Sequence, residues 1–166
     1  MNSLRFGTNL ASWLALCTIN AHMEYSLLEN WSVELSGRYN GFVYEMKRGE
    51  DKVHLMQRSV CVSGKWWARK AFDGWWVGPL VAWQEYDEGG IGRNAVERGT
   101  RMGGGVAAGY CFRLGPHVDV DLGLGVWAGT KVYDVYPGPK SLLEGSRGVG
   151  AFVLPYDLIV SFNYEF

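Results

Sequence analysis

Apolar and polar side chains alternate residue by residue over most of this chain. The last eleven residues are the clearest case, because apolar side chains recur at every second position from Tyr156 to Phe166. A period of two is the pattern of a β-strand with one buried face. It predicts no helix and eight strands, in the ranges 4–10, 19–25, 31–40, 59–66, 75–83, 101–113, 117–126 and 156–166.

The predicted connections between these strands alternate in length. Short turns are expected at 28–30, 70–74 and 114–116, partly because Pro and Gly supply turn geometry there. A brief link near Trp13 and longer connections at 47–52, 87–99 and 134–154 lie between them. Short turns at one end and longer loops at the other are typical of an up-and-down barrel. The chain is therefore expected to be one all-β domain over residues 1–166.

Side-chain size indicates which face of these strands points inward. The polar face carries small residues such as Gly7, Ser63, Gly105 and Gly125, whereas the apolar face carries nearly all of the large ones. A small closed barrel has little room inside, so the small polar face belongs there and the apolar face belongs against lipid. This predicts an eight-stranded antiparallel up-and-down transmembrane β-barrel. A soluble lipocalin-like barrel, with the apolar face around a ligand cavity, is the alternative.

Aromatic residues on the apolar face are expected to form two belts at the membrane interfaces. Eight residues along a strand rise about 26 Å, or about 20 Å along the membrane normal at a tilt near 40°. Such steps lead from Trp31 to Tyr39, from Trp75 to Trp83 and from Tyr164 to Tyr156. The predicted belt residues are Tyr25, Trp31, Tyr39, Trp66, Trp75, Trp83, Tyr110, Phe112, Tyr156, Tyr164 and Phe166.

The inward face carries five basic and five acidic residues, which can neutralise one another. They are Arg5, Arg38, Lys65, Arg101 and Arg113, and Glu24, Glu34, Asp119, Asp121 and Asp157. Unpaired charges in a narrow lumen would be costly, so we expect a polar plug that closes the barrel to ions. A path for protons or solutes is the functional alternative.

Charge and hydropathy exclude other classes of protein. A net charge of -1 and a pI near 6.3 exclude a basic nucleic-acid-binding surface. The uncharged segment 6–23 contains too many polar residues for a spanning helix, which needs about 20 predominantly apolar ones. It also lacks the small-x-small cleavage site of a signal peptide. If the protein is exported, we expect that its targeting peptide is absent from this chain.

The chemistry-bearing residues do not predict catalysis, a cofactor or a metal. Cys17, Cys61 and Cys111 have no CxxC spacing and are expected to be packing residues. His22 and Glu24 share the inward face, but a catalytic site needs a base that is oriented by a carboxylate and contacts a nucleophile. We therefore expect no enzyme, with a lipid-modifying hydrolase of the outer membrane as the alternative.

Four short motifs are Thr8-Asn9-Leu10, Met23-Glu24-Tyr25, Glu29-Asn30-Trp31-Ser32-Val33 and Lys65-Trp66-Trp67. Together with the aromatic C-terminal strand, they cover most of the chain and resemble a family of small, functionally uncharacterised outer-membrane barrels of the Bacteroides lineage, with an OmpA/OmpX-like architecture. The ending Tyr164-Glu165-Phe166 also resembles the sorting signal that the barrel-assembly machinery reads, which implies that Phe166 is an assembly signal. The resemblance implies a fold, a location in outer-membrane lipid and membership of a larger surface assembly. It implies no activity.

Two functional classes remain. A structural or accessory subunit would contact other outer-membrane proteins, whereas a stand-alone surface binder would present long extracellular loops. The longest predicted connection begins at Asp134 and is short for an adhesin. We therefore expect a structural or accessory subunit, with a surface-binding barrel as the alternative and a soluble ligand binder third.

Overall fold

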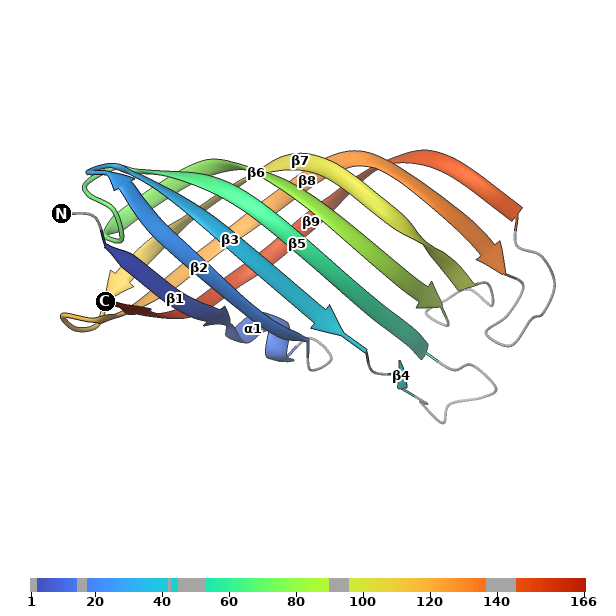
Figure 1. Ribbon diagram of the computed structural model, residues 1–166, viewed down its shortest axis with the longest axis horizontal. Coiled ribbons are helices and arrows are strands. Elements are labelled where there is room, and N and C mark those ends of the chain that lie inside the picture. Colours follow the sequence, from blue (N-terminus) through green and yellow to red (C-terminus); the bar gives the residue numbers. More distant parts are fainter. Residues whose placement is uncertain (1–2, 15–17, 42, 45–52, 90–95, 137–145) are drawn as a thin grey trace.

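The computed structural model describes residues 3–14, 18–41, 43–44, 53–89, 96–136 and 146–166. Its elements are β1 (Leu4–Asn9), α1 (Leu10–Leu14), β2 (Ile19–Leu28), β3 (Trp31–Asn40), β4 (Val43–Tyr44), β5 (Val53–Trp67), β6 (Gly74–Gly89), β7 (Val96–Arg113), β8 (Val118–Tyr136) and β9 (Ser146–Glu165). Consecutive long strands pair antiparallel, and the pairing of β1 with β9 closes the ring. This confirms the predicted all-β, eight-stranded, up-and-down antiparallel fold, with the two-residue β4 as an addition beside β5 (Figure 1).

The barrel wall is uneven in height (Figure 1). We call the end with the β2–β3, β5–β6 and β7–β8 turns the lower end, and the opposite end the upper end. Strands β1 to β3 have 6, 10 and 10 residues, whereas β9 has 20. As a result, β9 pairs with β8 along almost its whole length but with β1 only from Ser161 to Glu165.

Two predicted loops are largely strand. The predicted connections at 87–99 and 134–154 are wrong in extent, because β6 continues to Gly89, β7 begins at Val96, β8 continues to Tyr136 and β9 begins at Ser146. Backbone pairing continues there without the apolar alternation that marks the middle of each strand. Cross-strand ion pairs such as Lys131 with Glu97, at 2.6 Å, accompany it. Of the predicted connections, residues 47–52, 90–95 and 137–145 lie outside the described residues.

A short helix follows the first strand directly and contains the last residue of its predicted range. Range 4–10 was expected to be strand, but β1 ends at Asn9 and α1 follows at once. The Asn9 side chain explains this change, because its Oδ1 accepts a hydrogen bond from the Ala11 backbone N–H at 3.0 Å. Asn is among the favoured residues at a helix N-cap, where its side chain satisfies a free backbone donor. Among the described residues, no helix is both long and apolar enough to cross a membrane.

The interior is filled by small residues and by aromatic rings that point inward. A Cβ on Gly109 would lie 2.7 Å from Cζ2 of Trp76, and one on Gly123 would lie 3.2 Å from the same atom. Glycine at both positions therefore makes room for the Trp76 indole. The buried aromatic residues are Trp67, Phe72, Trp76, Tyr86, Trp127 and Phe152. Size alone did not predict them, since large residues were assigned to the outside.

The connection from β5 to β6 closes the lower end of the lumen. Phe72 has a positive φ of 68°, an uncommon conformation for a residue with a side chain. Its ring is fully buried and meets Trp67 edge to face at 5.8 Å between centroids. The predicted turn is therefore also a lid whose aromatic side chain enters the barrel.

A β-bulge changes the direction of one predicted belt residue. The register between β8 and β9 shifts where Gly125 faces Asp157 and Val126 faces Pro155. A bulge places one extra residue in a strand, so the extra residue does not follow the alternation. The extra residue is Tyr156, which lines the lumen and packs against the buried core. Its assignment to the outer aromatic belt is therefore wrong.

Candidate functional site: the charged interior

Arg5 on β1 is the centre of a buried ion-pair network in the lower half of the lumen. Its Nη1 lies 2.7 Å from Asp119 Oδ1. Its Nη2 lies 2.7 Å from Glu24 Oε2 and 2.7 Å from Asp121 Oδ2. The side chains of Arg5 and Glu24 are 0% exposed and those of both aspartates are 1% exposed. Loss of one partner would leave a buried charge without compensation, which makes these residues depend on one another.

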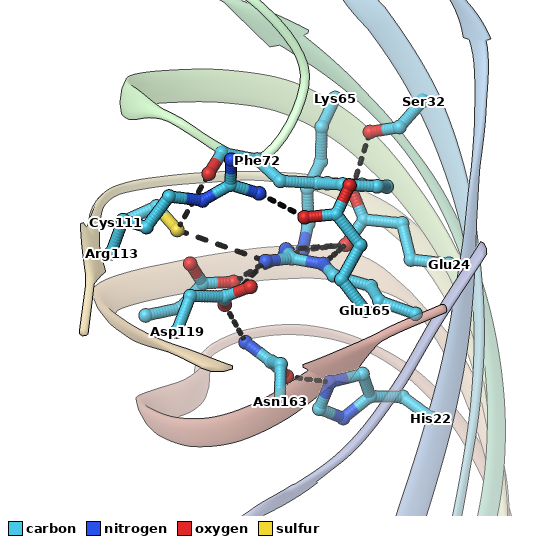
Figure 2. A network of polar contacts seen from close by, with 12 residues as sticks. His22, Glu24, Ser32, Lys65, Phe72, Cys111, Arg113, Asp119, Asn163 and Glu165 are labelled. Atoms are coloured by element: carbon cyan, nitrogen blue, oxygen red, sulfur yellow. Dashed lines mark hydrogen bonds and ion pairs between the residues drawn. The ribbon is translucent and has the colours of Figure 1, made fainter. Parts of the chain in front are cut away.

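Lys65 on β5 extends this network toward β3 (Figure 2). Its Nζ lies 2.8 Å from Glu24 Oε2 and 2.6 Å from Glu34 Oε2. Ser32 donates a hydrogen bond to the other oxygen of Glu24, and the Trp67 indole N–H donates to Ser32 Oγ at 2.7 Å. The structure thus brings together six of the ten predicted lumen charges.

Aromatic rings enclose both cations of the network. The Arg5 guanidinium lies 4.4 Å from the ring centroid of Phe72 and 5.2 Å from that of Trp67. The Lys65 ammonium lies 4.6 Å from the ring of Trp76. A desolvated cation over an aromatic ring gains about 2 kcal/mol, so the rings offset part of the cost of burying charge.

His22 does not form the acid–base pair that was considered with Glu24. Figure 2 shows its ring directed at Asn163, whose Oδ1 lies 2.6 Å from His22 Nε2. Asn163 Nδ2 donates to Asp119 Oδ1 at 2.6 Å. Because Oδ1 of this amide can only accept, Nε2 of His22 carries the proton. The hydrogen bonds from His22 through Asn163 to Asp119 therefore orient an amide rather than a nucleophile.

The other four predicted charges form three separate pairs. Arg38 pairs with Asp157, which also accepts from Asn9 Nδ2 at 2.7 Å. Arg101 pairs with Glu88, its Nη2 lying 3.0 Å from Glu88 Oε2. Arg113 pairs with Glu165 at the lower end (Figure 2). Sequence reasoning missed both glutamates: Glu88 lay in a predicted loop, and Glu165 had inward parity but was not included.

Two cavities along the lumen differ greatly in size. In the upper half, a cavity of about 400 Å³ is lined by Arg38, Gln57, Gln84, Trp127 and Tyr156, among others. Between this cavity and the lower network, a second cavity holds only about 40 Å³. The open upper lumen is therefore separated from the lower end by packed side chains.

The predicted lower aromatic belt lies on the outside of the barrel. Its rings contact one another in places, such as Trp75 with Tyr110 at 5.1 Å and Tyr164 with Phe166 at 5.0 Å between centroids. The Phe166 backbone N–H donates to Leu4 O at 2.9 Å, which ties the last residue to β1. Tyr25, Trp31, Trp66 and Phe112 are also exposed on this face. In the upper belt, Tyr39 is exposed and Trp83 half-buried, whereas Tyr156 points inward.

Two of the cysteines lie in the described part of the chain, and both are buried and free. Cys61 packs in the hydrophobic core. Cys111 lies beside the charged network, and its Sγ donates to the Phe72 carbonyl at 3.3 Å (Figure 2). Cys17 lies outside the described residues.

These features define a class of protein. It is an antiparallel eight-stranded barrel with large apolar side chains outside and a buried network of charges inside. The family model "Protein of unknown function (DUF3575)" matches residues 3–166. The chain belongs to the DUF3575 family. No curated protein matches it.

Proposed function

We propose that this protein is an integral β-barrel of the bacterial outer membrane with a closed lumen, and that it is an accessory subunit of a larger outer-membrane assembly. The distribution of polarity supports the location. Leu35, Val62 and Leu124 are 46%, 49% and 66% exposed on the outer face, whereas Arg5 and Glu24 are fully buried inside. Lipid favours such an arrangement, because a closed barrel pairs its own backbone groups and presents apolar side chains outward. A charged lumen does not suit a lipocalin-like carrier of apolar ligands.

The lower network supports a closed lumen rather than a pore. Arg5, Lys65 and their carboxylates lie across the interior, and the cavity next to them in the described part of the barrel holds only about 40 Å³. An ion would have to break these buried pairs to pass, and each broken pair costs about 3–5 kcal/mol. Purified protein in planar bilayers is therefore expected to give no steady conductance. Large ion-selective openings would overturn this part of the proposal.

The upper edge of β9, which α1 contacts but no strand pairs with in the described residues, supports the accessory role. Within the described residues, β9 has no strand partner on its β1 side above Ser161. The Asn9 side chain substitutes for a strand over two positions, since its Nδ2 donates to Leu158 O at 3.0 Å and its Oδ1 accepts from Val160 N at 3.1 Å. Farther up, Val149 and Val153 are 74% and 79% exposed beside this edge. An unpaired strand edge with apolar neighbours is suited to receive a strand from a partner protein.

The membrane location is tested by fractionation and by folding. The protein is expected in outer-membrane fractions, and the purified chain is expected to fold only in detergent or lipid because its apolar residues face outward. A monodisperse folded protein in plain buffer would contradict the proposal.

The accessory role is tested at the β9 edge. Val153→Lys on β9 is compared with Val132→Lys on β8, where the exposed valine lies on a strand that is paired on both sides. Mildly solubilised membranes are run on native gels. In a second measurement, a Val153→Cys variant is cross-linked to whichever protein lies against the β9 edge. We expect a complex larger than the monomer that Val153→Lys disrupts and Val132→Lys preserves. A monomer in every sample, or equal effects of both lysines, would contradict the role, and a cross-link between two copies would replace the accessory subunit with a homodimer.

A further inference from the structure

We infer that Cys111, Asp119 and Asp121 form a buried binding site for a divalent cation of the zinc class. The three residues come from the lower ends of β7 and β8, in which Cys111 is paired directly with Asp121. One ligand atom from each residue lies within 4.8 Å of the other two. In a tetrahedral site with usual bond lengths, two ligand atoms of one zinc ion lie about 3.3–3.8 Å apart. The three side chains would therefore have to move toward one another by up to about 1 Å to bind one ion.

Two unsatisfied oxygens point to a ligand at this cluster. Asp119 Oδ2 and Asp121 Oδ1 are buried, and neither has a hydrogen-bond partner in the described structure. Buried polar atoms nearly always have partners, and an isolated exception calls for an ion or another bound group. Arg5 binds the other oxygen of each aspartate at 2.7 Å. It thereby orients both carboxylates while their second oxygens stay available. Its Nη1 also lies 3.8 Å from Cys111 Sγ, so a bound metal would have to lie on the side of the three ligands away from the guanidinium.

The net negative charge of the network also favours a bound cation. Two cations, Arg5 and Lys65, contact the four carboxylates of Glu24, Glu34, Asp119 and Asp121. With the thiol protonated, the formal charge of this group is two minus four, or -2. A divalent cation supplies the two missing positive charges. Ligation by Cys111 Sγ releases the thiol proton to solvent. The group therefore has a net charge of -1 with the metal bound, compared with -2 without it.

The donor set selects the type of cation. A thiolate with two carboxylates suits zinc and similar borderline metals, whereas magnesium and calcium prefer oxygen donors alone. The Phe72 carbonyl, 3.3 Å from Cys111 Sγ, offers a further oxygen on the side of the lid. Because the site is buried on all sides, the metal would be enclosed as the barrel folds and then exchange slowly.

Metal content and a matched pair of cysteine variants test the inference. The chain is folded in detergent with zinc present, desalted, and its zinc is measured by mass spectrometry. We expect about one zinc per chain in the parent protein, in line with a three-ligand site. Cys111→Ser is expected to reduce the content to background. Cys61→Ser removes the other buried, free cysteine of the described structure and is expected to retain the metal.

A second measurement does not depend on the folding of any variant. The parent protein is folded with cobalt, and its sulfur-to-cobalt charge-transfer absorption is recorded before and after addition of a chelator. We expect the band to appear and to persist until the barrel is unfolded. Absence of the band, no zinc above background in the parent protein, or equal zinc in Cys111→Ser and the parent would overturn the site.

Discussion

The lower and upper halves of the lumen use the same kinds of residues in different surroundings. In the lower half, the Arg5 guanidinium forms ion pairs with three carboxylates. It is fully excluded from solvent and packs against the Phe72 ring. Above, Arg101 pairs with Glu88 beside a cavity and lies over the Tyr86 ring at 3.5 Å, and the side chains of the pair are 10% and 36% exposed. Water can compensate a lost partner in the upper half but not in the lower half. The comparison shows that position in the lumen, rather than charge itself, decides how much a residue contributes to stability.

Replacement of Arg5 by methionine is expected to have the largest effect. Arg5→Met keeps an unbranched apolar stem but leaves three buried carboxylates without their shared cation. Breaking a buried network in this way costs about 3–5 kcal/mol. Urea or guanidinium unfolding in micelles, followed by circular dichroism, measures the change in free energy of unfolding.

The matched variant for this test is Arg101→Met in the upper half. Its partner Glu88 is accessible to water, but Arg101 also lies over the Tyr86 ring, so the expected loss is about 1–2 kcal/mol and stays below that of Arg5→Met. Equal losses in the two variants would mean that solvent reaches the lower network as well, and the contrast between the two halves would not hold.

Truncation of the aromatic lid is expected to have the next largest effect. Phe72→Ala removes a fully buried ring that packs on Trp67 and on the Arg5 guanidinium. Deletion of a buried phenylalanine ring costs about 3 kcal/mol or somewhat more. Unfolding in micelles measures the loss, and Phe112→Ala, on the outer face of the barrel, is the control. A loss no larger than that of the control would show that the ring does not close the lower end.

Much of the fold follows from the sequence because alternation reports which face each strand buries. Arg5, Glu24 and Asp119 have inward parity by that rule alone. Their contact could not be predicted, since Arg5 and Asp119 are 114 positions apart and meet only through the register of a closed ring. Parity also fails where a bulge adds one residue, and Tyr156 turns inward for that reason.

Local side-chain chemistry explains the other departures from the predicted fold. Asn9 ends β1 by capping a helix, and no alternation pattern contains that information. Phe72 enters the lumen because its backbone adopts a left-handed conformation within a connection. The strand extensions above the upper belt are stabilised by backbone pairing and by ion pairs such as Arg98 with Asp87, at 3.8 Å, rather than by an apolar face.

The pair of Arg38 and Asp157 lies between the two halves and is expected to have an intermediate effect. Their side chains are 16% and 11% exposed, and Asn9 Nδ2 still donates to Asp157 when the arginine is lost. Arg38→Met is therefore expected to cost about 1–3 kcal/mol, the range for one unsatisfied buried partner. The same unfolding experiment measures it, and Asn9→Ala combined with Arg38→Met is expected to cost more than the sum of the single variants. Strict additivity would mean that Asn9 does not compensate for Arg38.

The smallest effect is expected at the exposed pair of Arg58 and Glu85, beyond Trp83 on the upper side. Their side chains are 62% and 37% exposed. The hydrogen bond from Arg58 lowers the pKa of Glu85 below its ordinary value. A lowered pKa in the folded state stabilises the protein above the ordinary pKa of a glutamate, and this contribution is lost as the pH falls through the lowered value. Because both groups are solvated, Arg58→Met is expected to leave the free energy of unfolding unchanged within error. Carbon NMR of the Glu85 carboxyl should nevertheless show its pKa rising toward the ordinary value in this variant, and an unmoved titration would show that the pair does not form in solution.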